Sequence, residues 1–222
     1  MCRPVKRRHH VGVDVRDLER GGPADAAVRL LGGIVTAGEV AVRIAEVEAY
    51  GGPIDSSWPD AASHSFRGAT ARNSVMFGPA GRLYVYLSYG MHLCMNVTCG
   101  RAGTAGAVLL RAGEVLSGAG VVETRRGAAR RWARGAASGP GNLGRALGVG
   151  LQDNGTDMFD ASAPVTLELL SRPLTGSVVG CGPRVGVSQA ADRRWRFWMQ
   201  GSPAVSAYRR SPRAPSSGEP ES

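Results

Sequence analysis

The chain has 222 residues, of which 43% are apolar and 20% are charged. This length suits one compact domain, and the composition supplies enough apolar side chains for a core, which argues against a wholly disordered protein. No stretch approaches the ~18 consecutive apolar residues that a membrane span needs. The basic N-terminus is not followed by the apolar run of a secretory signal. We therefore expect a soluble cytoplasmic protein, associated with the nucleoid if the source is prokaryotic.

The formal net charge of +9 is concentrated in one part of the chain. Residues 61–145 hold 11 arginines and only two acids, Glu114 and Glu123, while the remaining residues balance 16 basic against 16 acidic side chains. Such a stretch is typical of a surface that meets a polyanion, nucleic acid above all. Lys6 is the only lysine, so genome bias toward arginine explains part of the count. It does not explain why acids are missing from the same stretch.

In chain order, the pattern predicts a basic flexible lead, then helices and strands separated by glycine-containing turns. Pro23 suits the first turn of a helix, and the pair Gly32-Gly33 would end it. The predicted elements are a helix over 23–31, a hairpin over 34–50, a loop over 51–63, strands over 82–89, 91–99 and 107–112, helices over 121–134 and 139–148, and strands with turns over 184–208.

Hairpins mixed with a few separate helices are typical of an α+β domain. We expect a single compact domain over residues 14–210, with a mostly antiparallel curved sheet, a protruding β-hairpin and peripheral helices. Residues 1–13 would be the flexible lead, and residues 211–222, rich in serine, proline and glutamate, a disordered tail.

The reactive side chains narrow the possible chemistry. The four cysteines are few, unevenly spaced and form no C-x-x-C pair, so we expect reduced thiols and no metal site. The chain also lacks the glycine-rich loop of nucleoside triphosphatases, which predicts no nucleotide cofactor. With one lysine, in the N-terminal lead, almost no amine is left for Schiff-base chemistry. Any bond that this chain cleaves at a sugar should be cleaved by water.

The segment RIAEVEAY (43–50) places two carboxylates two residues apart. In a strand, Glu46 and Glu48 would project from the same face about 7 Å apart, with Tyr50 next in the row. The pair could be a solvated sheet edge, a metal site or an acid/base pair. A metal site is disfavoured because no further cluster of ligands is evident. The most economical catalytic reading is one carboxylate that acts as a base on water.

The segment RLYVYLSYGMHLCMN (82–96) gathers three of the chain's five tyrosines within six residues. Alternation would place Tyr84, Tyr86 and Ser88 on one face. A structural role, with a buried ring and a hydrogen-bonded hydroxyl, accounts for Tyr84. Tyr89 precedes Gly90 at the expected turn, so its ring should be exposed. An exposed aromatic ring in the most basic part of the chain suggests stacking on bases or wedging into a duplex.

Taken alone, His64 in the loop SHSFRG would more often be a structural hydrogen-bonding residue than a catalytic one. His9 and His10, in the basic lead, suggest no function, and His92 suggests no more than a surface or phosphate contact.

These segments, in this order, resemble the alkyladenine (3-methyladenine) DNA glycosylase family over residues 14–208. The matching stretches are RIAEVEAYGGP (43–53), SHSFRG and RNSVMFG (63–78), GRLYVYLSYGMHLCMNV (81–97), VLLRAGEVLSG (108–118), SGPGNLGRALG (138–148), PRVGVS (183–188) and RFWMQGSPAVS (196–206).

The resemblance implies a monofunctional base-excision enzyme that acts on double-stranded DNA with damaged purines, as a monomer and without a cofactor. Glu48 would be the general base, and Arg111 would lie beside the catalytic water. The remaining roles are a base pocket formed by Tyr50, His64, Tyr86 and Asn96, with Asn96 obstructing the 2-amino group of guanine, and a DNA wedge formed by Tyr89.

Two departures from the family pattern bear on the lesion range. Ser63 stands where alanine is usual, and TARNSVMFG stands where TPRNRGMFG is common. The second departure concerns the loop that would roof the pocket.

The alternative to an enzyme is a non-catalytic DNA- or RNA-binding module that kept the basic surface and the tyrosines.

Overall fold

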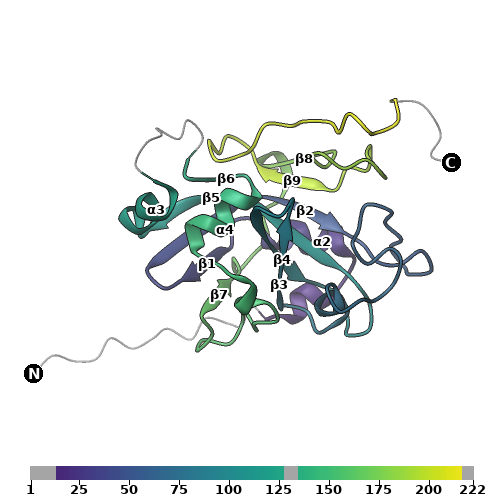
Figure 1. Ribbon diagram of the computed structural model, residues 1–222, viewed down its shortest axis with the longest axis horizontal. Coiled ribbons are helices and arrows are strands. Elements are labelled where there is room, and N and C mark those ends of the chain that lie inside the picture. The colour runs from purple at the N-terminus through teal and green to yellow at the C-terminus, as the bar shows by residue number, and fades with distance from the viewer. Residues whose placement is uncertain (1–13, 128–134, 217–222) are drawn as a thin grey trace, which may run out of the picture.

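The computed structural model describes residues 14–127 and 135–216, which fold around one nine-stranded sheet in which every pairing is antiparallel (Figure 1). The main path of the sheet runs β3-β4-β5-β2-β1-β7. The strands are β1 (Ile34–Ala37), β2 (Val40–Tyr50), β3 (Leu83–Ser88), β4 (His92–Thr98), β5 (Ala107–Ser117), β6 (Ala137–Ser138), β7 (Val165–Glu168), β8 (Val179–Gly182) and β9 (Arg196–Met199). The expected α+β class and the mostly antiparallel, curved sheet are confirmed.

Strand β2 is the centre of this sheet. It pairs with β5 along one edge, and its other edge is shared by β1 near its start and by β9 at residues 46–48. One broad apolar core includes Ile44 and Val47 of β2 together with Leu110 of β5. The central strand therefore carries the core on one face and is free to carry other chemistry on the opposite face.

The helices lie around the sheet, as expected (Figure 1). Contacts pack α2 on β2, and α4 on β4 and β5. The helices are α1 (Arg16–Glu19), α2 (Pro23–Leu30), α3 (Ala119–Arg126) and α4 (Pro140–Leu147), with 3-10 turns η1 (Ser74–Phe77), η2 (Leu151–Asp153) and η3 (Gly176–Val178). Among residues 14–127 and 135–216, no helix combines the length and hydropathy that crossing a membrane would require.

A pair of register shifts in the β2–β5 pairing surrounds Glu46. Ala45 and Arg111 have no partner there, because Ile44 pairs with Gly113, Glu46 with Ala112 and Val47 with Leu110. Such bulges re-aim the following side chains. The alternation of Val40, Val42 and Ile44 into the core would otherwise carry Glu46 and Glu48 into the core as well. Instead, Val47 and Ala49 take the core positions and the two glutamates lie on the opposite face.

Two expected elements differ in extent from the structure. The helix expected over 121–134 is α3, which ends before Gly127, a residue with a φ of 80°; residues 128–134 lie outside the described part of the chain. Within 184–208, only β9 is a strand. Residues 184–195 do not pair as a strand because their polar groups have other partners: the Val185 N–H, for example, binds the Glu48 carboxylate at 2.7 Å. The lead at 1–13 and residues 217–222 of the predicted tail also lie outside the described residues.

Candidate active site

A cavity of about 380 Å³ opens where the β3–β4 hairpin, β5, the end of β2 and two loops meet. This volume falls in the usual range for small-molecule sites. Six of the seven predicted site residues line it: Tyr50, His64, Tyr86, Tyr89, Asn96 and Arg111. The seventh, Glu48, is fully buried directly behind the wall, where it contacts three lining residues. The structure thus brings together side chains that are far apart in the sequence.

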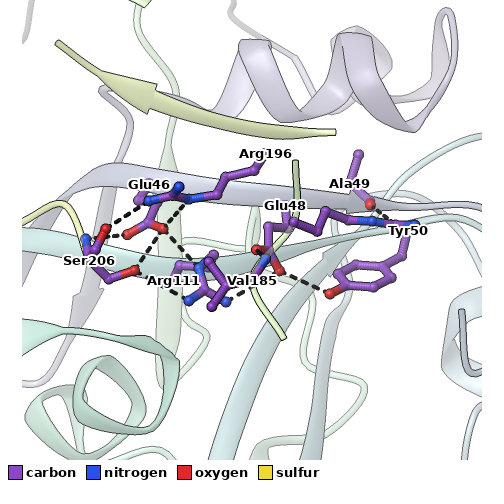
Figure 2. A network of polar contacts seen from close by, with 9 residues as sticks. Glu46, Glu48, Ala49, Tyr50, Arg111, Val185, Arg196 and Ser206 are labelled. Carbon is purple, nitrogen blue, oxygen red and sulfur yellow. Dashed lines mark hydrogen bonds and ion pairs between the residues drawn. The ribbon is translucent and has the colours of Figure 1, made fainter. Parts of the chain in front are cut away.

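Both oxygens of the Glu48 carboxylate have partners (Figure 2). Its Oε1 accepts a hydrogen bond from the Val185 N–H at 2.7 Å. Its Oε2 accepts one from the Tyr50 hydroxyl at 2.9 Å and lies 3.3 Å from an Arg111 guanidinium nitrogen. A carboxylate can accept about four hydrogen bonds. Among the described residues the Val185 N–H is the one donor to Oε1, so a second acceptor position on Oε1 is unfilled, and Val185 itself lines the cavity.

Glu46 is also fully buried, so the solvated edge that the sequence left open is excluded for both glutamates. Its Oε1 accepts hydrogen bonds from Arg111 Nε at 2.9 Å, Arg196 Nε at 2.7 Å and the Ser206 hydroxyl at 2.8 Å. Its Oε2 accepts one from the Ser206 N–H at 2.7 Å. Burial alone would raise the pKa of Glu46, but Arg111, Ser206 and Arg196 outweigh burial and hold it below its ordinary value.

Arg111 joins the two glutamates, and Figure 2 shows its guanidinium group between them. Burial alone would lower the pKa of Arg111, yet Glu48 and Glu46 together raise it. Burial and the neighbouring Glu48 charge also raise the pKa of the Tyr50 hydroxyl well above its ordinary value. Tyr50 therefore keeps its proton and donates it in a hydrogen bond to Glu48.

The aromatic wall comes from β3 and from the loop that follows β2. The rings of His64 and Tyr86 meet edge to face with centroids 4.6 Å apart. His64 Nδ1 lies 3.1 Å from the Tyr84 hydroxyl, so the buried Tyr84 ring has the hydrogen-bonded hydroxyl that the sequence allowed. His64 lines the cavity and is exposed. The protein atoms around it, and then the charge of Arg72, lower its pKa, which favours a neutral ring.

The tip of the β3–β4 hairpin carries Tyr89, which is 90% exposed and has a φ of 49°. With Gly90 also at positive φ, the turn has the backbone twist of tight hairpins. Cross-strand pairing fixes the rest of this face: Asn96 lies opposite Tyr84, and Cys94 opposite Tyr86. Asn96 donates a hydrogen bond from Nδ2 to the Tyr84 carbonyl at 3.1 Å and lines the cavity.

Three supporting residues were not foreseen. Arg184 and Asp60 form a fully buried pair, with nitrogen–oxygen distances of 2.6 and 2.9 Å, and the Arg184 guanidinium lies 4.7 Å from the Tyr50 ring centroid. Asn73 is buried and donates hydrogen bonds to the His64 and Gly68 carbonyls at 2.8 and 3.0 Å, which fixes the His64 loop. Arg184 and Asn73 stand in the matching stretches PRVGVS and RNSVMFG. Arg184 is 124 residues from Asp60, and Asn73 is nine residues from His64, and no sequence pattern predicted either contact.

The arginine-rich stretch 61–145 does not lie wholly on the surface. Arg111 is buried against Glu46 and Glu48, and Arg82 pairs with Asp157 at 3.1 Å, so acids from outside the stretch neutralise two of its arginines. Arg67, Arg72 and Arg101 are exposed. In the described part of the chain, no three His, Cys, Asp or Glu side chains are grouped as metal ligands would be.

Comparison with known proteins decides the family. A family model described as methylpurine-DNA glycosylase (MPG) matches residues 17–203. The chain belongs to this family. Relatives named "Putative 3-methyladenine DNA glycosylase" include one from Nocardia farcinica (strain IFM 10152), 64% identical over 87% of this chain and 90% of its own length. Those from Rhodococcus jostii (strain RHA1) and Mycolicibacterium paratuberculosis are each 58% identical, over 93% and 88% of this chain and 91% and 93% of their own lengths.

As a methylpurine-DNA glycosylase, the protein is a DNA-repair enzyme that acts on DNA, and the family resemblance seen in the sequence is confirmed. The match covers the strands, loops and helices that form the cavity. A binding module without activity is disfavoured by this membership.

Proposed function

We propose that this glycosylase removes 3-methyladenine, with hypoxanthine, ethenoadenine and 7-methylguanine as further candidates, by flipping the damaged nucleotide into the cavity. A water molecule would attack C1′ of the sugar, the bond from C1′ to the base would break, and an abasic site would remain. One chain supplies every site residue named above, so a monomer suffices. The substrate would be genomic DNA in the cytoplasm.

The observation that carries the proposal is the free acceptor position on Glu48 Oε1, beside Val185 in the cavity wall. A general base must reach the water whose proton it accepts. In the proposed step, Oε1 takes that proton while the new carbon–oxygen bond forms. The electron pair of the broken bond leaves with the base. Arg111 and Tyr50 hold Oε2, so the carboxylate keeps its orientation as its charge changes.

The lining of the cavity supports a purine as the flipped group. The Tyr50, Tyr86 and His64 rings offer flat and edge surfaces for a planar base, and Asn96 narrows the space on the β4 side. Tyr89, exposed at the hairpin tip, is suited to fill the gap that the flipped nucleotide leaves in the duplex. Damaged pairs cost less energy to unstack than normal ones, which adds to selectivity.

Replacing Glu48 with glutamine tests the base assignment. Glu48→Gln keeps the size of the side chain but removes the basic carboxylate. The single amide oxygen can still accept one of the two hydrogen bonds that Tyr50 and Val185 donate to Glu48. We expect excision of hypoxanthine from a duplex to slow by about 10²–10⁴-fold, with DNA affinity retained. The measurement is single-turnover strand breakage after alkali, with binding followed by fluorescence anisotropy.

Undiminished excision by Glu48→Gln would overturn the assignment of the base. Wild-type protein that binds the damaged duplex but excises none of the four lesions would favour the alternative, a nucleic-acid-binding module.

The scarcity of lysine supports a monofunctional enzyme with no lyase activity, because lyases form a Schiff base from an amine. We expect borohydride to trap no covalent complex between the protein and damaged DNA. The assay follows protein–DNA adducts on a denaturing gel, with a bifunctional glycosylase as positive control. An adduct that disappears in Lys6→Ala would show lyase chemistry from this side chain and contradict the proposal.

A further inference from the structure

Both tyrosine walls of the cavity have a guanidinium group against them. Arg184 Cζ lies 4.7 Å from the Tyr50 ring centroid, and Arg72 Cζ lies 5.6 Å from the Tyr86 ring centroid. Neither arginine is among the residues that line the cavity. Tyr86 also borders a second hollow, of about 420 Å³, and Arg72 lines that one. Tyr86 therefore borders both hollows, and Arg72 lines only the second.

The two arginines differ in how their charge is balanced. Arg184 is buried and paired with Asp60. More widely, the buried charges beside the cavity cancel, with three carboxylates against three arginines: Glu46, Glu48 and Asp60 against Arg111, Arg184 and Arg196. Arg72 is exposed and pairs with no acid among the described residues. It therefore adds one unbalanced positive charge beside the Tyr86 wall.

This charge acts differently on the two classes of damaged purine. Purines alkylated at N3 or N7 carry a positive charge, and the negative faces of aromatic rings attract cations. A guanidinium group that contacts Tyr86 competes with a cationic base for the negative potential of that ring, and its positive charge repels the base. Hypoxanthine and ethenoadenine are neutral, and they gain negative charge as the bond to the sugar breaks. A nearby positive charge stabilises that development.

We infer that Arg72 is a specificity-determining residue that shifts the preference of this enzyme from cationic toward neutral damaged purines. The inference rests on the proposed function, because it requires the flipped base to stack against Tyr86. Arg72 would act through the ring and through its field rather than by touching the base.

The experiment is a competition between two lesions in one reaction. Duplexes of different length carry 7-methylguanine or hypoxanthine, each opposite cytosine and in the same sequence, so that the product ratio reports the ratio of kcat/KM values. The reaction is run at pH 8, where the His64 ring is neutral with or without Arg72, and the enzyme-free loss of 7-methylguanine is subtracted. The proteins are wild type, Arg72→Gln and, as control, Arg67→Gln.

Arg67 is the matched control because it lies in the same loop region, is exposed and has no cation–π contact among the described residues. Its replacement removes the same charge from the DNA-binding protein. We expect the 7-methylguanine to hypoxanthine ratio to rise about two- to fivefold in Arg72→Gln, as for loss of one exposed cation–π contact, and to stay at the wild-type value in Arg67→Gln.

A ratio in Arg72→Gln that is unchanged, lower, or shifted equally in Arg67→Gln would overturn the inference. Equal slowing on both lesions would leave the ratio unchanged and would identify Arg72 as a phosphate contact. These outcomes leave the proposed function standing. Wild-type protein that excises neither lesion would overturn the proposed function, and this inference with it.

Discussion

Glu46 and Glu48 lie two residues apart on one strand, are equally buried and share one arginine, yet their surroundings differ. Glu46 accepts four hydrogen bonds, and two of its partners, Arg196 and Ser206, stand outside the cavity lining. All three partners of Glu48 line the cavity, and one of its acceptor positions is unfilled by the described residues. Burial and charge alone therefore do not separate a structural carboxylate from a candidate base. What separates the two is that every partner of Glu48 lines the cavity, whereas Arg196 and Ser206 hold Glu46 from outside it.

The largest expected difference between the two glutamates is in their contribution to stability. Glu46→Gln leaves Arg196 without its carboxylate and Arg111 with only Glu48. We expect the free energy of unfolding to fall by about 3–5 kcal/mol, as when one partner of a buried ion pair is removed. Glu48→Gln should cost clearly less, because Arg111 keeps its contact with Glu46. Urea unfolding followed by circular dichroism measures both.

Glu114→Gln is the control for that experiment. Glu114 pairs with Arg43 at 3.5 Å, and both side chains are partly exposed. Its replacement should cost less than about 1 kcal/mol. Equal losses from Glu46→Gln and Glu48→Gln would show that the two carboxylates are structurally equivalent.

Acidification should reduce the stability that the ionised Glu46 carboxylate contributes. The folded protein holds a proton on Glu46 more weakly than the unfolded chain, since the pKa is lowered from 4.5. The contribution of the ionised carboxylate is then complete above pH 4.5 and is lost as the pH falls through the lower folded pKa. The stability difference between wild type and Glu46→Gln should be constant from neutral pH down to about pH 5 and shrink below pH 4.5. Unfolding series across this range measure it, and a difference that grows on acidification would contradict the lowered pKa.

The smallest effect on stability is expected at the open side of the cavity, at Tyr89. Because its side chain is 90% exposed, Tyr89→Ala should change the free energy of unfolding by less than about 0.5 kcal/mol. Excision from a fully paired duplex should nevertheless slow, and excision from mismatched or single-stranded DNA should slow less. Equal slowing on all three substrates would show that Tyr89 does not act as a wedge.

Local patterns predicted much of this fold. The hairpin that carries the tyrosines follows strict alternation over residues 83–98, and its register places Tyr84 and Tyr86 on the face of Asn96 and Cys94. The helices α2 and α4 begin at prolines and are followed by glycines at positive φ, and for α2 the sequence predicted both the proline start and the glycine end. These features depend on neighbours a few residues away, so a sequence contains them directly.

The remaining features depend on contacts between distant segments. The bulge at Ala45 reverses which residues of β2 face the core. No residue type in AVRIAEVE (41–48) predicts a bulge. The pair Arg184–Asp60 and the clamp of Arg196 and Ser206 on Glu46 join residues more than a hundred positions apart. Sequence reasoning could name Glu48 through a family resemblance, but not Arg196 and Ser206, the distant partners that hold Glu46.

The hydrogen bonds from Ser206 to Glu46 also bear on how the protein is made. Glu46 leaves the ribosome 160 residues before Ser206, and Arg196 precedes Ser206 by only ten. Such distant contacts form late, because a long loop must close first. A chain interrupted before Arg196 holds both glutamates and Arg111 without the segment that seals them from solvent. Only a chain that has been extended past Ser206 can therefore acquire the charge balance of the finished site.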